Sequence, residues 1–293
     1  MSKKKLLSIY FIAALILSAF FAITQIICYK NCFDLSVNHF KSGSVLPTVI
    51  YILLAISCIF ILSSALIFKS NKPRRTPKTS DSDVWANAVM SFFFFAIAAV
   101  EVLLYIIRIA KSFALYDSRA GFFEVIFSGI TKYLRGERVE NLFILLSVVF
   151  AVLSGIYFFF CASKKASTKT IIYFSLFPSV FGICDLIAVY FSQNVTHNSP
   201  LKITAELSAL VFMVYFLSEC KDIAGVSESA NFNIASLLLA LVILSAFSIP
   251  RVILTIAGFF SFDADFIYYV LHLATVVYII SKYLPTVFKK RDN

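Results

Sequence analysis

The stretch from Phe232 to Gly258 reads FNIASLLLALVILSAFSIPRVILTIAG and decides the class of this protein. It is an apolar run longer than the roughly 20 residues that a helix needs to cross a bilayer. Its one charged residue is Arg251, which follows Pro250. A positive charge at membrane depth costs about 3 kcal/mol on insertion scales. We therefore expect a membrane-spanning helix in which another segment compensates Arg251.

The composition of the whole chain supports the same class. Of the 293 residues, 60% are hydrophobic and 14% are charged, whereas soluble domains average about 25% charged residues. The formal net charge of +10 comes from basic residues that flank the apolar runs. This placement is typical of membrane topology signals and not of a nucleic-acid groove, so we expect no nucleic-acid partner.

The apolar runs predict an all-α integral membrane protein with about eight transmembrane helices in one domain over residues 1–293. Between the third and fourth runs, apolar residues recur at helical spacing opposite charged ones, which predicts an amphipathic surface helix at about 122–135. The predicted spans are about 6–29, 45–68, 85–109, 141–162, 171–191, 201–218, 232–258 and 265–284.

The distribution of Lys and Arg predicts the orientation of these spans. Most basic residues of the connections fall on the side that holds the N-terminus, which places both termini in the cytoplasm. If residues 122–135 crossed the membrane, Lys164 to Lys169 and the basic C-terminus would face outward, so we reject that topology. We expect a cell-membrane protein whose partners are the lipid bilayer and, at the basic loop 69–83, anionic headgroups of the cytoplasmic leaflet.

Under this topology, several ionisable residues fall at one depth in different spans. Each lies roughly 8 to 12 Å beneath the outer boundary, at 1.5 Å per residue, whereas the inner half of the bundle has almost none. The members of this layer are Glu101, Asp185, Glu206, Arg251 and His272. Such residues are rare in spans and mark functional sites. They predict an outward-facing polar pocket as a candidate binding site.

In this pocket Arg251 pairs with Asp185, Glu206 or Glu101, and Arg108 stands at the rim, one heptad after Glu101. Pro178 and Pro250 help to shape it, because a proline inside a helix kinks it and frees a carbonyl.

Two other interpretations of the layer stay open. The charges can form a structural ion-pair cluster without a ligand, or the positions can be unrelated. In the second case Arg251 snorkels to the headgroups, Glu206 sits in the first turns of its helix, and His272 is a core residue.

Small residues also predict a helix contact. Ser147, Ala151 and Gly155 recur every fourth residue in the fourth span, a stripe that allows two helices to approach closely.

The sequence contains no motif of a known catalytic site and no pattern typical of a zinc site or a disulfide framework. We expect no catalytic residues, metal or cofactor. The hypothesis we place first is an accessory or sensory membrane protein with an outward-facing polar pocket. The alternative is a small-solute or ion transporter, although transporters place their sites near the midplane. An intramembrane enzyme is the second alternative.

Three stretches carry a resemblance. They are LFPSVF from Leu176 with Asp185 downstream, VFMVYFL from Val211, and SIPR from Ser248. In these the C-terminal half resembles a group of multi-pass membrane proteins from anaerobic Gram-positive bacteria. The resemblance implies a location in the bacterial inner membrane and implies no activity.

Overall fold

The computed structural model describes residues 3–67, 81–114, 139–164, 167–192, 199–225, 230–262 and 265–288. These parts are helical apart from turns and a two-stranded hairpin of β1 (Phe33–Asp34) and β2 (His39–Phe40). The helices are α1 (Lys3–Cys32), α2 (Val45–Ile67), α3 (Asp81–Ala114), α5 (Val139–Ser163), α6 (Thr168–Phe174), α7 (Phe177–Phe191), α8 (Pro200–Ile223), α9 (Ala230–Ile256) and α10 (Asp265–Phe288).

Eight segments of the described chain are long and apolar enough to cross a membrane, with α6 and α7 together forming the fifth. The predicted all-α, multi-pass class is therefore confirmed. The amphipathic helix predicted at 122–135 lies outside the described residues.

Several helices extend beyond the predicted spans, α3 and α8 by the largest margins at one end. α3 has 34 residues and so measures about 51 Å, longer than the roughly 30 Å hydrocarbon core. α8 continues five residues past Ser218, to Ile223. A helix does not have to end where its apolar run ends, because its backbone hydrogen bonds form equally well in polar flanks.

Pro178 does not occupy the mid-helix position predicted for it, whereas Pro250 does. Ser175 and Leu176 interrupt the fifth span, and Pro178 falls in the first turn of α7. Backbone N–H groups of a first turn have no acceptor within the helix, so the N–H that proline lacks costs no helical hydrogen bond there. Pro250 is inside α9, and the helix continues past it to Ile256.

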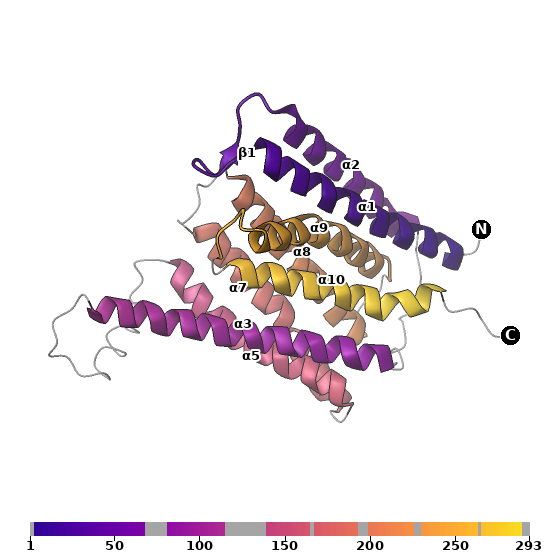
Figure 1. The fold of residues 1–293 in the computed structure, drawn as a ribbon. Coiled ribbons are helices and arrows are strands. Elements are labelled where there is room, and N and C mark those ends of the chain that lie inside the picture. Colours follow the sequence, from indigo (N-terminus) through magenta and orange to yellow (C-terminus); the bar gives the residue numbers. More distant parts are fainter. Residues whose placement is uncertain are drawn as a thin grey trace.

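In the described part of the chain, six helices form a closed ring. α3 packs on α5, α5 on α7, α7 on α8, α8 on α9, α9 on α10, and α10 on α3. The remaining pair, α1 and α2, packs on α9 from outside the ring. Figure 1 shows α1 and α2 at one edge of the bundle and α3 and α5 at the opposite edge.

Aromatic side chains fill the ring. Phe94 stacks on Phe158 at 5.5 Å between ring centroids and reaches across to Phe212 at 6.4 Å. Phe158 contacts Tyr278 on the facing α10 at 5.5 Å. We call the group of Phe94, Phe158, Phe181, Phe212 and Phe216 the aromatic core; each is at most 1% exposed.

The small-residue stripe on α5 makes the predicted close contact. A Cβ on Gly155 would lie 2.9 Å from the ring of Phe95 on α3. Ser91 on α3 donates a hydrogen bond to the Gly155 carbonyl at 2.8 Å, and Ala151 is fully buried. The stripe therefore packs α5 directly against α3, and this prediction is confirmed.

The bundle has two distinct ends. α1 begins and α10 ends at one of them, which we call the termini end (Figure 1). The opposite end carries the β1–β2 hairpin, and we call it the hairpin end. The Ser199 hydroxyl, at the start of α8, donates to the Asn38 carbonyl at 2.9 Å and ties the hairpin to the ring.

Candidate functional site

Carboxylates from three helices gather towards the hairpin end; two of them are buried, and that of Asp265 is exposed. Asp185 on α7 is 5% exposed and Glu101 on α3 is 4% exposed. The Asp185 carboxylate interacts electrostatically with Asp265, at the start of α10, and with Glu101. Asp185 lies six residues before Phe191, the last residue of α7, which is about 9 Å along the helix. We call these three residues the acid cluster.

Tyr268 joins the acid cluster to a fourth helix. Its hydroxyl lies 3.5 Å from that of Ser147 on α5 and interacts with Glu101. Its ring stacks on Phe181 of the aromatic core, with 6.0 Å between centroids and 12° between planes. The acid cluster therefore rests directly on the aromatic core.

Arg251 lies in other surroundings, on the side of the ring that faces α1. Its guanidinium is 4.1 Å from the ring centroid of Phe260 and 5.8 Å from that of Tyr269. It also interacts with Tyr29 on α1. With 8% of its surface exposed, Arg251 is enclosed by protein and does not snorkel towards lipid. Cation–π contacts of this kind stabilise a desolvated guanidinium by about 2 kcal/mol.

The geometry of α10 separates Arg251 from the acid cluster. Tyr268 and Tyr269 are consecutive, so their side chains point about 100° apart around the helix. Tyr268 faces Ser147 and Glu101, whereas Tyr269 faces Arg251. The structure thus brings Glu101 and Asp185 together but places Arg251 elsewhere.

His272 lies one turn below Tyr269, at the edge of the aromatic core. Its ring is 5.3 Å from that of Phe212 and 6.3 Å from that of Tyr269, and 3% of its surface is exposed. Among the described residues, neither ring nitrogen finds a hydrogen-bond partner. It is therefore a buried ionisable group that makes no hydrogen bond to a described residue, and it lies between the two ends of the ring.

The other two predicted site residues do not join these groups. Glu206 on α8 is half-buried, and it takes no part in the contacts given above for Asp185, Arg251 and His272. Arg108 belongs to α3, but its side chain lies outside the described part of the chain.

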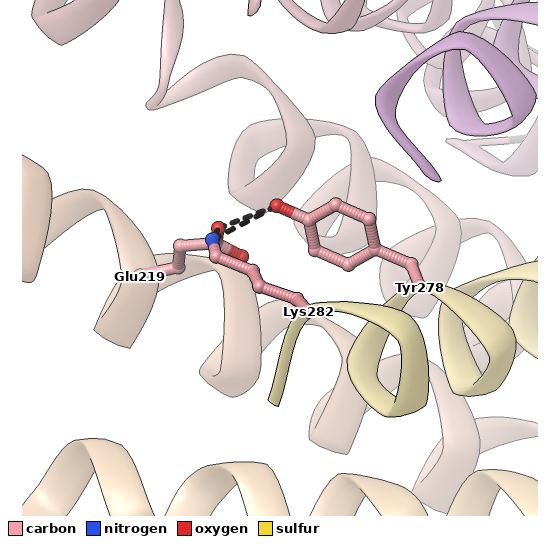
Figure 2. Close-up of polar contacts among 3 residues, drawn as sticks. All are labelled: Glu219, Tyr278 and Lys282. Carbon is pink, nitrogen blue, oxygen red and sulfur yellow. Dashed lines mark hydrogen bonds and ion pairs between the residues drawn. The ribbon is translucent and has the colours of Figure 1, made fainter. Parts of the chain in front are cut away.

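A further polar cluster lies near the termini end, where the sequence predicted almost no ionisable residues in the bundle. Figure 2 shows that the Glu219 carboxylate of α8 meets Lys282 and Tyr278 of α10. The Tyr278 hydroxyl donates to Glu219 Oε1 at 2.7 Å, and Lys282 Nζ donates to the same oxygen and to Tyr278 Oη, the latter at 3.0 Å. Glu219 is 7% exposed.

The expectation that the inner half of the bundle has almost no ionisable groups misses this cluster. Glu219 lies one residue past Ser218, the predicted end of its span. α8 continues to Ile223 and carries Glu219 against α10. Tyr278 and Lys282 are four residues apart and therefore share one helix face. This spacing is the feature of the sequence that indicates the site.

No metal centre is evident in the described ranges, where no three His, Cys, Asp or Glu residues are grouped so that they could hold a metal ion. The six cysteines are free thiols. No protein-family model, curated protein or solved structure matches this chain.

Proposed function

We propose that this multi-pass membrane protein is a sensor in the cell membrane that responds to protonation of the acid cluster. The observation that carries the proposal is the burial of Asp185 beside two further carboxylates, Glu101 and Asp265. Like charges at low dielectric repel strongly. A proton bound to one of these carboxylates weakens this repulsion.

Binding at this place is coupled to helix packing. Glu101, Asp185 and Asp265 come from α3, α7 and α10, respectively. Protonation lets these three helices pack more closely, and loss of the proton lets the carboxylates repel one another. A ligand that binds one arrangement of the helices better than another shifts the equilibrium between the two arrangements. A sensor requires such a shift.

The aromatic core favours sensing over transport. It fills the ring directly below Tyr268, between the acid cluster and the Glu219–Lys282 pair.

We infer an orientation with the hairpin end outside and both termini in the cytoplasm, because most basic residues of the connections lie on the termini side. The basic flanks on that side then attract anionic headgroups.

Proton transport is the second candidate function, and His272 favours it. This side chain lies in the ring between the two polar clusters and makes no hydrogen bond to a described residue. Ionisable residues inside spans often serve as proton relays.

Reconstitution in liposomes with an internal pH-sensitive dye separates these two functions. A sensor gives no proton flux under an imposed pH gradient, but its conformation changes with pH. The single tryptophan, Trp85, reports that change because it stands on α3 with Glu101. Asp185→Asn is expected to abolish the fluorescence change, and Glu206→Gln to keep it. Proton flux that disappears in His272→Phe supports the transporter instead.

A further inference from the structure

A second set of buried polar groups lies outside the ring, where α1 and α2 pack on α9. The Ser18 hydroxyl of α1 donates to the Leu241 carbonyl of α9 at 3.0 Å and fixes the register of these two helices. Seven residues further along each helix, Gln25 on α1 is level with Ser248 on α9. Ser248, Arg251 and Thr255 share one face of α9, since they are three and four residues apart.

These groups converge near the hairpin end. Tyr51 on α2 lies beside Gln25 and Tyr29 of α1. Tyr29 in turn lies beside Arg251 and beside Thr204 of α8. We call the set of Gln25, Tyr29, Tyr51, Ser248, Arg251 and Thr255 the Gln25 cluster. It combines a guanidinium, hydroxyls and one amide.

Several polar atoms of the Gln25 cluster have no hydrogen-bond partner among the described residues. They are both amide atoms of Gln25 and the hydroxyls of Tyr51, Ser248 and Thr255. Gln25, Ser248 and Thr255 are each at most 1% exposed. Buried polar groups in proteins are almost always hydrogen-bonded, and the need is stronger where no bulk water is present. Ser248 and Thr255 share the face of α9 that carries Arg251, and Tyr51 lies beside Gln25. Buried polar groups of this kind are expected in a site that is completed by a ligand.

The hairpin end of the cluster is covered by aromatic side chains. Phe33 and Phe40 of the β1–β2 hairpin pack on Tyr29 at 5.3 and 5.7 Å, and Phe260 packs on Tyr29 at 5.6 Å. Gln25 lies seven residues before Cys32, the last residue of α1, which is about 10 Å. A molecule at the surface of the hairpin end therefore lies within one side-chain layer of the cluster.

We propose that the Gln25 cluster binds a phosphate group, either of a lipid headgroup or of a free solute. Arg251 supplies positive charge, and guanidinium groups suit the geometry of phosphate oxygens. The Gln25 amide N–H and the three hydroxyls donate to the remaining oxygens. Gln25 Oε1 accepts from an O–H of the ligand, which a protonated inorganic phosphate or the glycerol of phosphatidylglycerol provides.

The test measures thermal unfolding of the purified full chain in neutral detergent at constant pH. One arm titrates inorganic phosphate against sodium chloride of equal ionic strength, and the other titrates phosphatidylglycerol against phosphatidylcholine. A ligand that binds the folded state raises the unfolding midpoint in proportion to its occupancy. A rise with inorganic phosphate identifies a solute site, and a rise with phosphatidylglycerol alone identifies a lipid site.

Variants of the cluster keep the test decisive. Gln25→Leu and Ser248→Ala are expected to weaken the apparent affinity about tenfold or more. Without ligand, Gln25→Leu is expected to melt above the parent chain, because it removes two unsatisfied buried atoms. Thr24→Val is the matched control, since Thr24 adjoins Gln25 and donates to its own helix at 2.9 Å; it should keep full affinity.

Two results overturn the proposal. One is an unfolding midpoint that neither probe raises in the parent chain, the result expected if the cluster holds ordered water. The other is a ligand-induced rise of the unfolding midpoint that is as large in both Gln25→Leu and Ser248→Ala as in the parent chain. Since pH is constant and Asp185 is unchanged throughout, failure here is independent of the sensor proposal.

Discussion

Lys282 and Glu219 form an ion pair between α10 and α8, and the Tyr278 hydroxyl donates to the same Glu219 oxygen at 2.7 Å. The Glu219 side chain is 5% exposed and that of Lys282 is 20% exposed. Lys282→Met leaves the Glu219 charge buried without its cation and is expected to lower the free energy of unfolding by about 3 kcal/mol. Titration with SDS in mixed micelles measures this loss.

Removing both charges should restore most of that stability. The double variant Lys282→Met with Glu219→Gln is expected to unfold close to the parent chain, because a buried pair adds little net stability over neutral groups. Lys221→Met, at an exposed position of α8, is the control and should change stability by less than about 0.5 kcal/mol. Equal losses in Lys221→Met and Lys282→Met would contradict a specific pair.

The contact between Phe95 and Gly155 predicts a dependence on side-chain size. Gly155→Ala gains about 1 kcal/mol of helix propensity, which offsets the displacement of a ring that is 40% exposed and can shift. Gly155→Leu must separate α5 from α3 and break the hydrogen bond from Ser91, so it should cost about 3 kcal/mol. SDS unfolding of the two variants tests this; similar stability in both would show that the approach is not tight.

Asp185 is expected to reduce the stability of the folded chain at neutral pH. Asp185→Asn keeps the shape of the side chain and removes a buried charge that faces Glu101 and Asp265. We expect the unfolding free energy to rise by about 1–2 kcal/mol. Glu206→Gln is the matched control at a half-buried position, with a change below about 0.5 kcal/mol. A stability loss in Asp185→Asn would mean that its negative charge is compensated in the folded chain.

The hairpin loop should loosen in acid. Asp34 accepts hydrogen bonds from the Ser36 amide at 2.9 Å and the Ser36 hydroxyl at 2.6 Å, and these bonds hold the pKa of the Asp34 carboxyl below its usual value of about 3.9. Their stabilisation is fully present above that usual pKa and is lost as the pH falls through the lowered one. Ser36 amide exchange, corrected for its intrinsic pH dependence, should therefore lose protection in acid. Asp34→Asn should show no such step.

Orientation can be tested by cysteine labelling in intact cells. Ser42, in the turn between β2 and α2, and Thr168, at the start of α6, are exposed and belong to opposite ends of the bundle. With the proposed topology, a membrane-impermeant maleimide labels Ser42→Cys directly and labels Thr168→Cys only after permeabilisation. The unsubstituted chain gives the background from the native thiols. The reverse pattern would invert the topology.

The fold class follows from the sequence because the bilayer imposes a local requirement. Any run of about 20 apolar residues must satisfy its backbone internally, and a helix does so without reference to the other segments. The stripe of Ser147, Ala151 and Gly155 also identified a close helix contact, since small side chains leave room for a neighbour. The partner, α3 with Phe95 and Ser91, was not part of that prediction.

Partner choice among the ionisable residues required the tertiary structure. Depth in the membrane can be counted along each segment, so Glu101, Asp185 and Arg251 were placed at similar levels. Which of them meet depends on helix order around the ring and on helix rotation. Tyr268 and Tyr269 are consecutive on α10, but their side chains point to different sides of the helix. Tyr268 therefore contacts Ser147, whereas Tyr269 contacts Arg251. The sequence by itself thus determined the spans and the depth of their charges, because both depend on local composition. Only the tertiary structure decided that Arg251 stacks on Phe260, that Asp185 faces carboxylates and that Glu219 meets Lys282, because lateral packing is not encoded in any single segment.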